Sequence, residues 1–289
     1  MPNTFLKPNI IAREALMLLR NNAVMANLVH RDYSDEFVAG VGDTITIRKP
    51  ATFQAKEFED KIELQDATEG SATVKMDKLI DVSFAVTSEQ LTLDIEDFSR
   101  QLIVPAMQAF ADKIDKYLIA LEKDITENRV AHADGPIAPA DIIAARKMLG
   151  DSAAPLSGRS LVLGTAAEAD LLSTELFVSA EKVGDNGTAL REASLGRKFG
   201  FDTYVDQNIT KDTYTPAIAF HKNAFAFVTR PLALPKGAKE AAIVNYDGFG
   251  LRVVYDYDIN TKQDIVSIDM LCGVKTLDKK LAAVIEDQR

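Results

Sequence analysis

The sequence predicts a mixed α+β protein in which one long helix separates two groups of strands. Apolar residues recur at helical spacing from residue 94 to residue 129, a long stretch for a globular domain, where the mean helix has about 11–12 residues. Apolar and polar residues alternate over 71–87 and again over 250–277, as in half-buried strands. Shorter helix and strand patterns follow one another between residues 139 and 228.

Composition places the chain among globular proteins. Of its 289 residues, 47% are hydrophobic and 26% are charged, which is ordinary for such proteins. No apolar run reaches the roughly 18–20 residues of a membrane span, so we predict no membrane partner. The N-terminal MPNTFLKPN lacks the basic-then-apolar order of a signal peptide, so we expect the chain to stay in the cytoplasm where it is made. Cys272 is the only cysteine, which excludes intrachain disulfides and thiolate metal clusters.

The charge balance argues against sequence-specific nucleic-acid binding. The formal net charge is −10, whereas proteins that neutralise phosphates usually present a basic face. Only the N-terminal segment is basic, with Lys7, Arg13, Arg20 and Arg31 against Glu14. We interpret these charges as a solvated helix face.

The N-terminal segment is predicted to contain an amphipathic helix over residues 9–20, with Asn9 as a possible cap. It carries too few apolar residues to form a core of its own. We therefore expect it to pack on the rest of the chain or on a neighbouring subunit.

A long hairpin is predicted next. A half-buried strand in TITIRKP (44–50) and one longer strand over 71–87 are joined by a charged stretch. Because an isolated two-stranded arm is marginally stable in water, we expect it to need a partner surface. The alternative interpretation of the connecting stretch is a surface loop.

The long helix is predicted from Asp97 to Asn128, a span of roughly 45 Å. Acidic residues at its start favour a helix N-terminus. Pro105 either kinks this helix or marks its restart. The apolar stripe consists of Phe98, Leu102, Ile103, Met107, Phe110, Ile114, Tyr117, Leu118, Leu121 and Ile125.

The remaining chain is predicted to alternate between helices and strands before it ends in long strands. A Pro- and Gly-bearing loop is expected over 232–239, and Asp258 begins a hairpin turn. Helices are expected at 141–149 and 166–172, and strands at 160–163, 201–205, 217–221, 224–228, 250–258, 263–277 and 281–285.

No catalytic arrangement stands out. His30, His132 and His221 are isolated, and no nucleotide-binding glycine loop or nucleophile elbow is present. Carboxylate pairs such as Asp256 with Asp258 are typical of solvated surfaces. We therefore predict no catalytic, cofactor-binding or metal-binding residues, no cofactor, and a protein that is not an enzyme.

Five blocks, in this order, resemble the major capsid (coat) proteins of tailed bacteriophages, which have the Johnson fold. The resemblance is greatest to the coat-protein family of short-tailed Salmonella-type phages. The blocks are HRDYSDEFVAGVGDTITIRKP (30–50), SRQLIVPAMQAFADKIDKYL (99–118), LGRKFGFDTYVDQNI (195–209), AIAFHKNAFAFVTRPL (217–232) and VVYDYDINTKQDIVSIDMLCGVKTLD (253–278).

The resemblance implies an α+β capsid fold with five parts. These are an N-arm (1–42), an extended E-loop hairpin (43–87), a peripheral domain with the spine helix (88–134), an axial domain (135–248) and the return strands of the peripheral domain (249–289).

The resemblance also implies a function. The chain would self-assemble as hexamers and pentamers into an icosahedral shell, the capsid of a virion, that encloses packaged double-stranded DNA. Assembly would take place in the host cytoplasm with a scaffolding protein and a portal. One alternative is an encapsulin-type nanocompartment shell, and a second is an α/β hydrolase with an unrecognised carboxylate site.

Contacts between subunits are expected from two parts of such a subunit. In the E-loop the expected contact residues are Lys56, Phe58, Glu59, Asp60, Lys61 and Ile62. In the N-arm they are Ile11, Leu16, Leu19 and Arg20.

Overall fold

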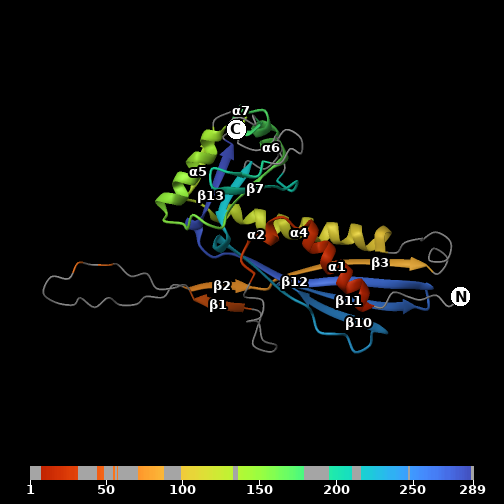
Figure 1. Ribbon diagram of the computed structural model, residues 1–289. Helices are drawn as coiled ribbons and strands as arrows, with labels where there is room; N and C mark the ends of the chain where they lie inside the picture. The colour runs from red at the N-terminus through yellow and green to blue at the C-terminus, as the bar shows by residue number, and fades with distance from the viewer. Residues whose placement is uncertain are drawn as a thin grey trace.

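Two sheets lie on either side of one long helix, and a two-stranded arm extends from one of them (Figure 1). The six-stranded sheet and its helices lie above this helix in Figure 1, and the five-stranded sheet lies below it. The computed structural model describes residues 8–31, 44–48, 55, 57, 71–87, 99–132, 136–178, 195–209, 216–246 and 248–287.

The N-terminal segment forms α1 (Pro8–Asn22) and a single turn, α2 (Met25–Leu28). The predicted helix over 9–20 is therefore confirmed. α1 packs on the long helix and on two strands of the five-stranded sheet. Its buried face is the stripe expected of an amphipathic helix, with Ile11, Leu16 and Leu19 inside.

The long helix runs without interruption from residue 99 to residue 124. It consists of a π-helical turn (Ser99–Ile103), the α-helix α4 (Val104–Ile119) and a 3-10 turn (Ala120–Asp124). Pro105 lies in the first turn of α4, where its missing N–H is tolerated. The wider π-helical turn thus leads directly into regular α-helical bonding at Pro105, and the choice between a kink and a restart stays a prediction.

The predicted end of this helix was wrong. The chain becomes extended at Ile125, and β4 (Arg129–His132) begins soon afterwards. β4 pairs with the last strand of the chain, β13 (Ala282–Asp287). Six of the ten predicted stripe residues are buried: Ile103, Met107, Phe110, Ile114, Leu118 and Ile125. Leu102, Tyr117 and Leu121 are half-buried, and Phe98 lies outside the described residues.

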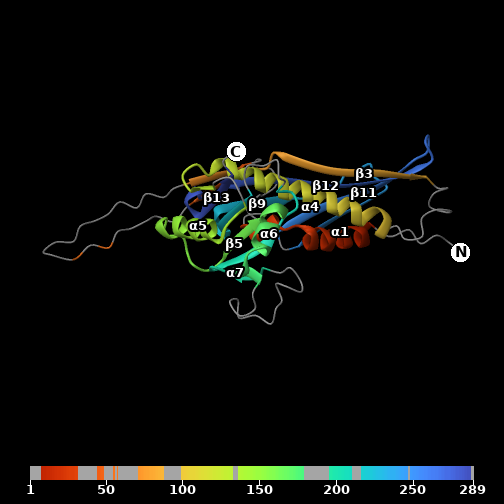
Figure 2. The ribbon, with the colours of Figure 1, turned by 90° about the horizontal axis from the view of Figure 1, so that it is seen from above.

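The five-stranded sheet is antiparallel in every pairing. β12 (Gln263–Thr276) is its central strand and pairs on one side with β3 (Lys78–Thr87). On its other side it pairs first with β11 (Phe249–Asp258) and then with β9 (Phe225–Arg230). β10 (Glu240–Tyr246) pairs with β11 at the far edge. Helices α1 and α4 cover one face of this sheet (Figure 2).

The six-stranded sheet has the order β4-β13-β8-β5-β7-β6. Its remaining strands are β5 (Arg159–Leu163), β6 (Arg197–Lys198), β7 (Phe201–Val205) and β8 (Ala217–His221). The helices α5 (Pro139–Asp151), α6 (Thr165–Leu172) and α7 (Glu175–Val178) contribute to a second apolar core with these strands.

The arm begins with β1 (Thr44–Arg48), which pairs antiparallel with β2 (Ser71–Lys75). The single strand predicted over 71–87 is in fact two strands, because β2 pairs with β1 whereas β3 pairs with β12. The two strands separate at Met76–Asp77. The predicted parity continues across the break, so Val74, Met76 and Ile80 are all buried.

The expected parts of the chain do not coincide with the sheets. β9 and β10 fall within 135–248, yet both belong to the five-stranded sheet. β13 falls within 249–289, yet it belongs to the six-stranded sheet. The chain crosses between the sheets first through α4, from β3 to β4, and later at two short 3-10 turns. These turns are Lys222–Ala224 and Lys279–Leu281, which contact each other.

Candidate assembly surfaces

The arm is attached to the body of the subunit by a small apolar cluster of its own. Ile47 of β1, Val74 of β2 and Met76 pack against Ala226 and Val228 of β9. This cluster is separate from the two main cores. The direction in which the arm leaves the sheet is therefore set by its own packing.

A glycine makes the close approach of the arm possible. A side chain at Gly273 of β12 would meet the backbone of Lys75 and Met76. Next to this point Lys78 forms an ion pair with Asp77 at 2.9 Å and lies over the Tyr117 ring of α4. The hydrogen bond from Lys78 lowers the pKa of the Asp77 carboxyl below its ordinary value.

The six E-loop residues expected to contact a neighbour lie outside the described residues. They are Lys56, Phe58, Glu59, Asp60, Lys61 and Ile62. Their contacts stay predictions, and the structure supplies only the position of the base from which that stretch continues.

Of the four N-arm residues expected to contact a neighbour, three are covered by their own chain. Ile11, Leu16 and Leu19 are 2%, 6% and 0% exposed and belong to the core that α4 shares with the five-stranded sheet. Arg20 is exposed. The outward stripe of α1 also carries two large apolar side chains, Ile10 and Met17. In this conformation a contact through α1 would use that outward stripe.

A buried carboxylate fixes the N-terminal segment to the long helix. Asp115 of α4 accepts hydrogen bonds from the backbone N–H groups of Val24 (2.8 Å) and Ala26 (3.2 Å). It thereby satisfies donors at the start of α2, as a capping side chain would. Burial raises the pKa of Asp115 to about 7, although these backbone hydrogen bonds oppose the shift.

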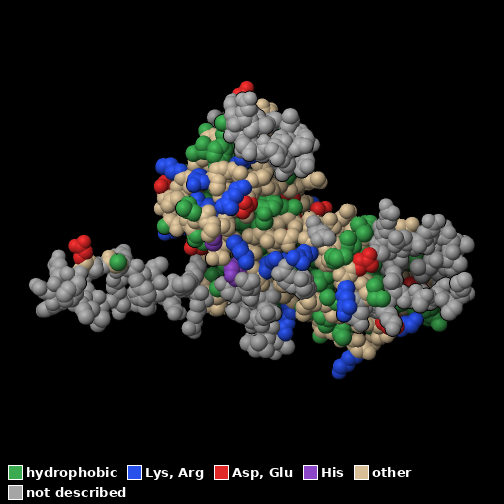
Figure 3. Space-filling model, viewed as in Figure 1, with side chains coloured by type: hydrophobic (Ala, Val, Ile, Leu, Met, Phe, Trp, Pro, Cys, Tyr) green, Lys and Arg blue, Asp and Glu red, His purple; other side chains and the backbone are tan. Residues whose placement is uncertain are grey.

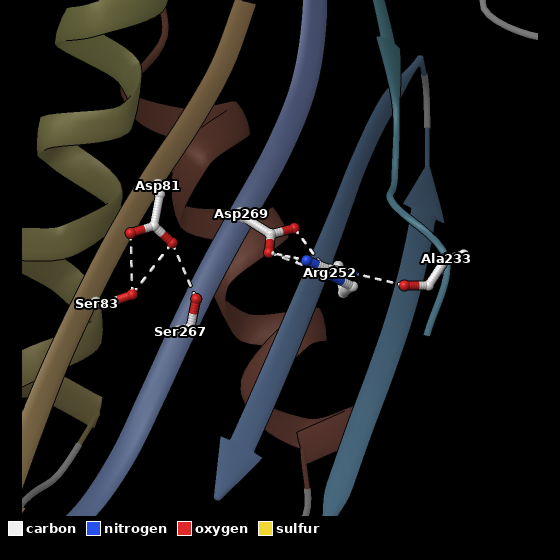
Figure 4. A network of polar contacts seen from close by, with 6 residues as sticks. All are labelled: Asp81, Ser83, Ala233, Arg252, Ser267 and Asp269. Atoms are coloured by element: carbon white, nitrogen blue, oxygen red, sulfur yellow. Dashed lines mark hydrogen bonds and ion pairs between the residues drawn. The ribbon is translucent and has the colours of Figure 1, made fainter. Parts of the chain in front are cut away.

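The face of the five-stranded sheet opposite the helices carries a polar row across three strands (Figure 4). Asp81 of β3 accepts hydrogen bonds from Ser83 and from Ser267 of β12, each at 2.9 Å. Asp269 of β12 accepts hydrogen bonds from Arg252 of β11, whose Nε lies 3.0 Å from both carboxylate oxygens. The same guanidinium donates to the Ala233 carbonyl in the loop before β10.

This sheet face combines a shielded ion pair with exposed groups. The Asp269 and Arg252 side chains are only 6% and 18% exposed, whereas Asp81 is exposed. Leu79 and Ile265 are exposed apolar side chains on the same face. The sequence pattern predicted that Asp81 and Ser83 share a face, but nothing in it singled out Arg252 or Asp269.

The isolated histidines each have a local structural contact. His132 Nδ1 lies 2.9 Å from Asp141 of α5, and the His221 ring accepts from the Asn223 backbone N–H. Burial lowers the pKa of His221, and the Arg159 charge adds to this shift. The His30 backbone N–H donates to the Phe225 carbonyl, and its carbonyl accepts from the Phe227 N–H, in a parallel bridge opposite Ala226.

Other reactive or ligating groups do not converge in the described part of the chain. No set of three or more histidine, cysteine, aspartate or glutamate side chains there could hold a metal ion. Cys272 is buried in β12, and its burial raises the thiol pKa to about 12. Among the described helices, none combines the length and apolar character needed to cross a membrane.

Charge is mixed on the face that carries α1. Figure 3 shows basic, acidic and apolar side chains interspersed there. The large apolar side chains with the highest exposed fractions are spread over both sheets and their helices. They are Ile10, Met17, Leu79, Ile143, Leu156, Leu176, Leu234 and Ile259.

The fold matches solved structures from phages, a mature capsid among them, and a virus-like particle over most of its length. The "Mycobacterium phage Che8" structure matches with a TM-score of 0.64 at 19% identity, covering 91% of this chain and 90% of that chain. The asymmetric unit of the bacteriophage PhiM1 mature capsid matches with a TM-score of 0.65 at 12% identity, covering 93% and 88%. A virus-like particle from Pyrococcus furiosus matches with a TM-score of 0.53 at 13% identity, covering 96% and 98%.

The sequence itself matches a family model. No curated protein matches it significantly. The model of the phage capsid protein family matches residues 72–266, from the second strand of the arm to the first residues of β12 and thus more than half of the chain. The mixed helix and sheet architecture agrees with the capsid folds of the structural matches. This chain therefore belongs to the phage capsid protein family.

Proposed function

We propose that this capsid protein is the major subunit of an icosahedral phage shell, assembled from hexamers and pentamers, that encloses double-stranded DNA. The observation that carries the proposal is the family match together with an arm that leaves the body of the subunit (Figure 1). An isolated two-stranded arm gains little stability by itself. The base of the arm packs on β9, and a neighbouring subunit would supply a partner surface for the stretch between β1 and β2.

The parts of such a subunit can be assigned to the fold. The five-stranded sheet with α1 and α4 would form the peripheral domain, and the six-stranded sheet would form the axial domain. The arm would be the E-loop, with contacts at Lys56, Phe58, Glu59, Asp60, Lys61 and Ile62. Arg20 and the outward stripe of α1 would contribute N-arm contacts. The quoted sequence blocks favour membership of the coat-protein family of short-tailed Salmonella-type phages.

The acidic composition suits a container for nucleic acid. With a net charge of −10, the shell would hold DNA without sequence-specific binding and without strong attachment to it. Assembly would take place in the host cytoplasm on a scaffolding protein, and DNA would enter through a portal.

Assembly of the purified full chain tests this proposal. Electron microscopy and light scattering, with and without a co-expressed scaffolding protein, should reveal closed shells or capsomers of five and six subunits. If only monomers are found at every concentration, salt and scaffold ratio, the proposal fails.

A compartment shell that encloses protein cargo is the second candidate. The match to the Pyrococcus furiosus virus-like particle, which spans 96% of this chain, favours it. Nuclease treatment of shells isolated from infected cells distinguishes the two. Protected genome-length DNA supports the phage shell, whereas protected protein without DNA supports the compartment.

A further inference from the structure

Two carboxyl groups are buried in the region where α4 and the turn after β7 share one apolar cluster. Asp115 of α4 and Asp206, in the turn that follows β7, are each 2% exposed. The charge of Asp206 acts on Asp115. Among the described residues, the other charged groups that act on the pair are Asp112 and Lys116 of α4.

The two carboxyl groups differ in how many of their oxygens accept hydrogen bonds. Both oxygens of Asp115 accept backbone N–H groups of the N-terminal segment. Oδ1 of Asp206 accepts from the backbone N–H and the side-chain amide of Asn208, at 2.8 and 2.9 Å. Oδ2 of Asp206 is buried and has no hydrogen-bond partner among the described residues. A buried carboxylate oxygen without a donor is costly while it is charged.

The turn that carries Asp206 links the six-stranded sheet to α4. The Asp206 N–H donates to the Leu163 carbonyl of β5 at 2.9 Å, which ties the turn to the six-stranded sheet. Ile209, at the end of the turn, is 2% exposed and lies in the same apolar cluster as Phe110 and Ile114 of α4. Apolar packing thus holds the turn on α4, while the carboxyl pair opposes this packing whenever both groups are ionised.

We propose that the Asp115–Asp206 pair is a proton-dependent contact between α4 and the six-stranded sheet. With a proton on the pair, the 206–209 turn stays packed on α4. With both groups ionised, the turn loosens. Asp115 still holds the N-terminal segment, because it continues to accept hydrogen bonds from the Val24 and Ala26 N–H groups. The proposal concerns the folded chain itself and does not rest on the shell function.

The pH range follows from the sign of the shifts. Burial raises the pKa of Asp115 to about 7, and the charge of Asp206 adds to the shift. Burial also raises the pKa of Asp206 above its ordinary value. Because the folded pKa values lie above those of the unfolded chain, the stabilisation is complete at acidic pH and is lost as the pH rises toward and through neutrality.

Hydrogen exchange of the full chain tests the proposal. Exchange of the amides of 206–209 and of 24–31 would be measured between pH 5.5 and 8.5, corrected for intrinsic rates, with the assembly state held constant and checked by light scattering. Protection of 206–209 should fall about tenfold, the effect of one pKa unit, while protection of 24–31 should stay constant. Constant protection of 206–209, or loss in 24–31 first, overturns the proposal even if no variant folds.

Two variants separate the pair from general effects of charge. Asp206→Asn removes one charge of the pair and should abolish most of the pH-dependent loss at 206–209. Asp112→Asn removes an exposed charge of α4 that also acts on Asp206, and it should weaken the pH-dependent loss at 206–209 less than Asp206→Asn does. If both variants keep the loss, the pair is not its source. If both abolish it, the summed charge of this region is responsible and the proposed pair is rejected.

Discussion

Arg252 of β11 and Asp269 of β12 stand opposite each other in the register of the five-stranded sheet and form an ion pair with the Arg252 Nε 3.0 Å from both carboxylate oxygens. Across β12, Asp269 also stands opposite Asp81 of β3. Two carboxylates directly opposite each other would repel. Arg252 offsets the charge of the buried one, and Ser83 and Ser267 donate to the exposed one.

Asp269→Asn should therefore destabilise the subunit more than a surface charge change does. The substitution leaves the partly buried Arg252 guanidinium without its counter-charge. We expect a loss of about 2 kcal/mol, because the pair is more shielded than a surface ion pair yet not fully buried. Urea unfolding would measure the loss. The control Asp256→Asn removes an exposed acid from β11 and should change stability by less than about 0.5 kcal/mol. Equal losses of stability in the two variants would show that the ion pair stabilises the fold no more than an exposed charge does.

Gly273→Ala should disturb the base of the arm. The added methyl group would meet the Lys75 backbone, so β2 must shift away from β12. We expect a loss of about 1–3 kcal/mol, as for overpacking elsewhere, and earlier proteolysis within 44–75 than in the wild type. Gly150→Ala is the matched control, because nothing lies within 4 Å of the added group and alanine favours the α5 helix by about 0.5–1 kcal/mol. An unaffected Gly273→Ala protein would mean that the arm tolerates displacement freely.

The helix and most of the strands could be predicted from local patterns, whereas their pairing could not. The α4 stripe is set by spacing, so Met107, Phe110, Ile114 and Leu118 were predicted correctly as buried. The end of the helix was not, because Arg129 enters β4 only by pairing with Val284 at the end of the chain. β10 was not predicted, since its place depends on pairing with β11 and on cover from α1.

For the polar face of the five-stranded sheet, the sequence could predict only which side chains of one strand point to the same side. Alternation placed Asp81 and Ser83 on one face of β3, as observed. The role of Arg252 depends on the register between β11 and β12, which no local pattern contains. Asp115 lies between apolar positions of α4 and is buried because α2 covers it. A carboxylate next to a helical apolar stripe is the only local signal that it offered.

Stability at acidic pH should depend on His221. Burial and the Arg159 charge lower its pKa below the ordinary value of about 6.5. The neutral ring contributes stability that is fully present above pH 6.5 and is lost as the pH falls toward the lowered folded pKa, because the unfolded chain binds the proton first. His221→Asn keeps an acceptor for the Asn223 N–H but does not titrate. Thermal unfolding at pH 7.5 and 5.0 should show a smaller acid-induced drop in Tm for this variant. An identical drop would place the acid sensitivity elsewhere.

Replacing Phe58 and Ile62 together with serine should weaken assembly without unfolding the subunit. Both residues belong to the charged stretch between β1 and β2, whose base is held by the cluster of Ile47, Val74 and Met76. If they dock on a neighbour, each lost apolar side chain removes about 1.5–3 kcal/mol of burial from every contact. Light scattering should then show a critical concentration for shell formation raised by at least tenfold, with the Tm of the unassembled subunit unchanged. Glu63→Ser with Gln65→Ser alters the same stretch without removing an apolar side chain and should assemble as the wild type does. Normal assembly of the Phe58 and Ile62 variant would show that the arm binds its neighbour through other residues, whereas a fall in Tm would show that these side chains stabilise their own subunit.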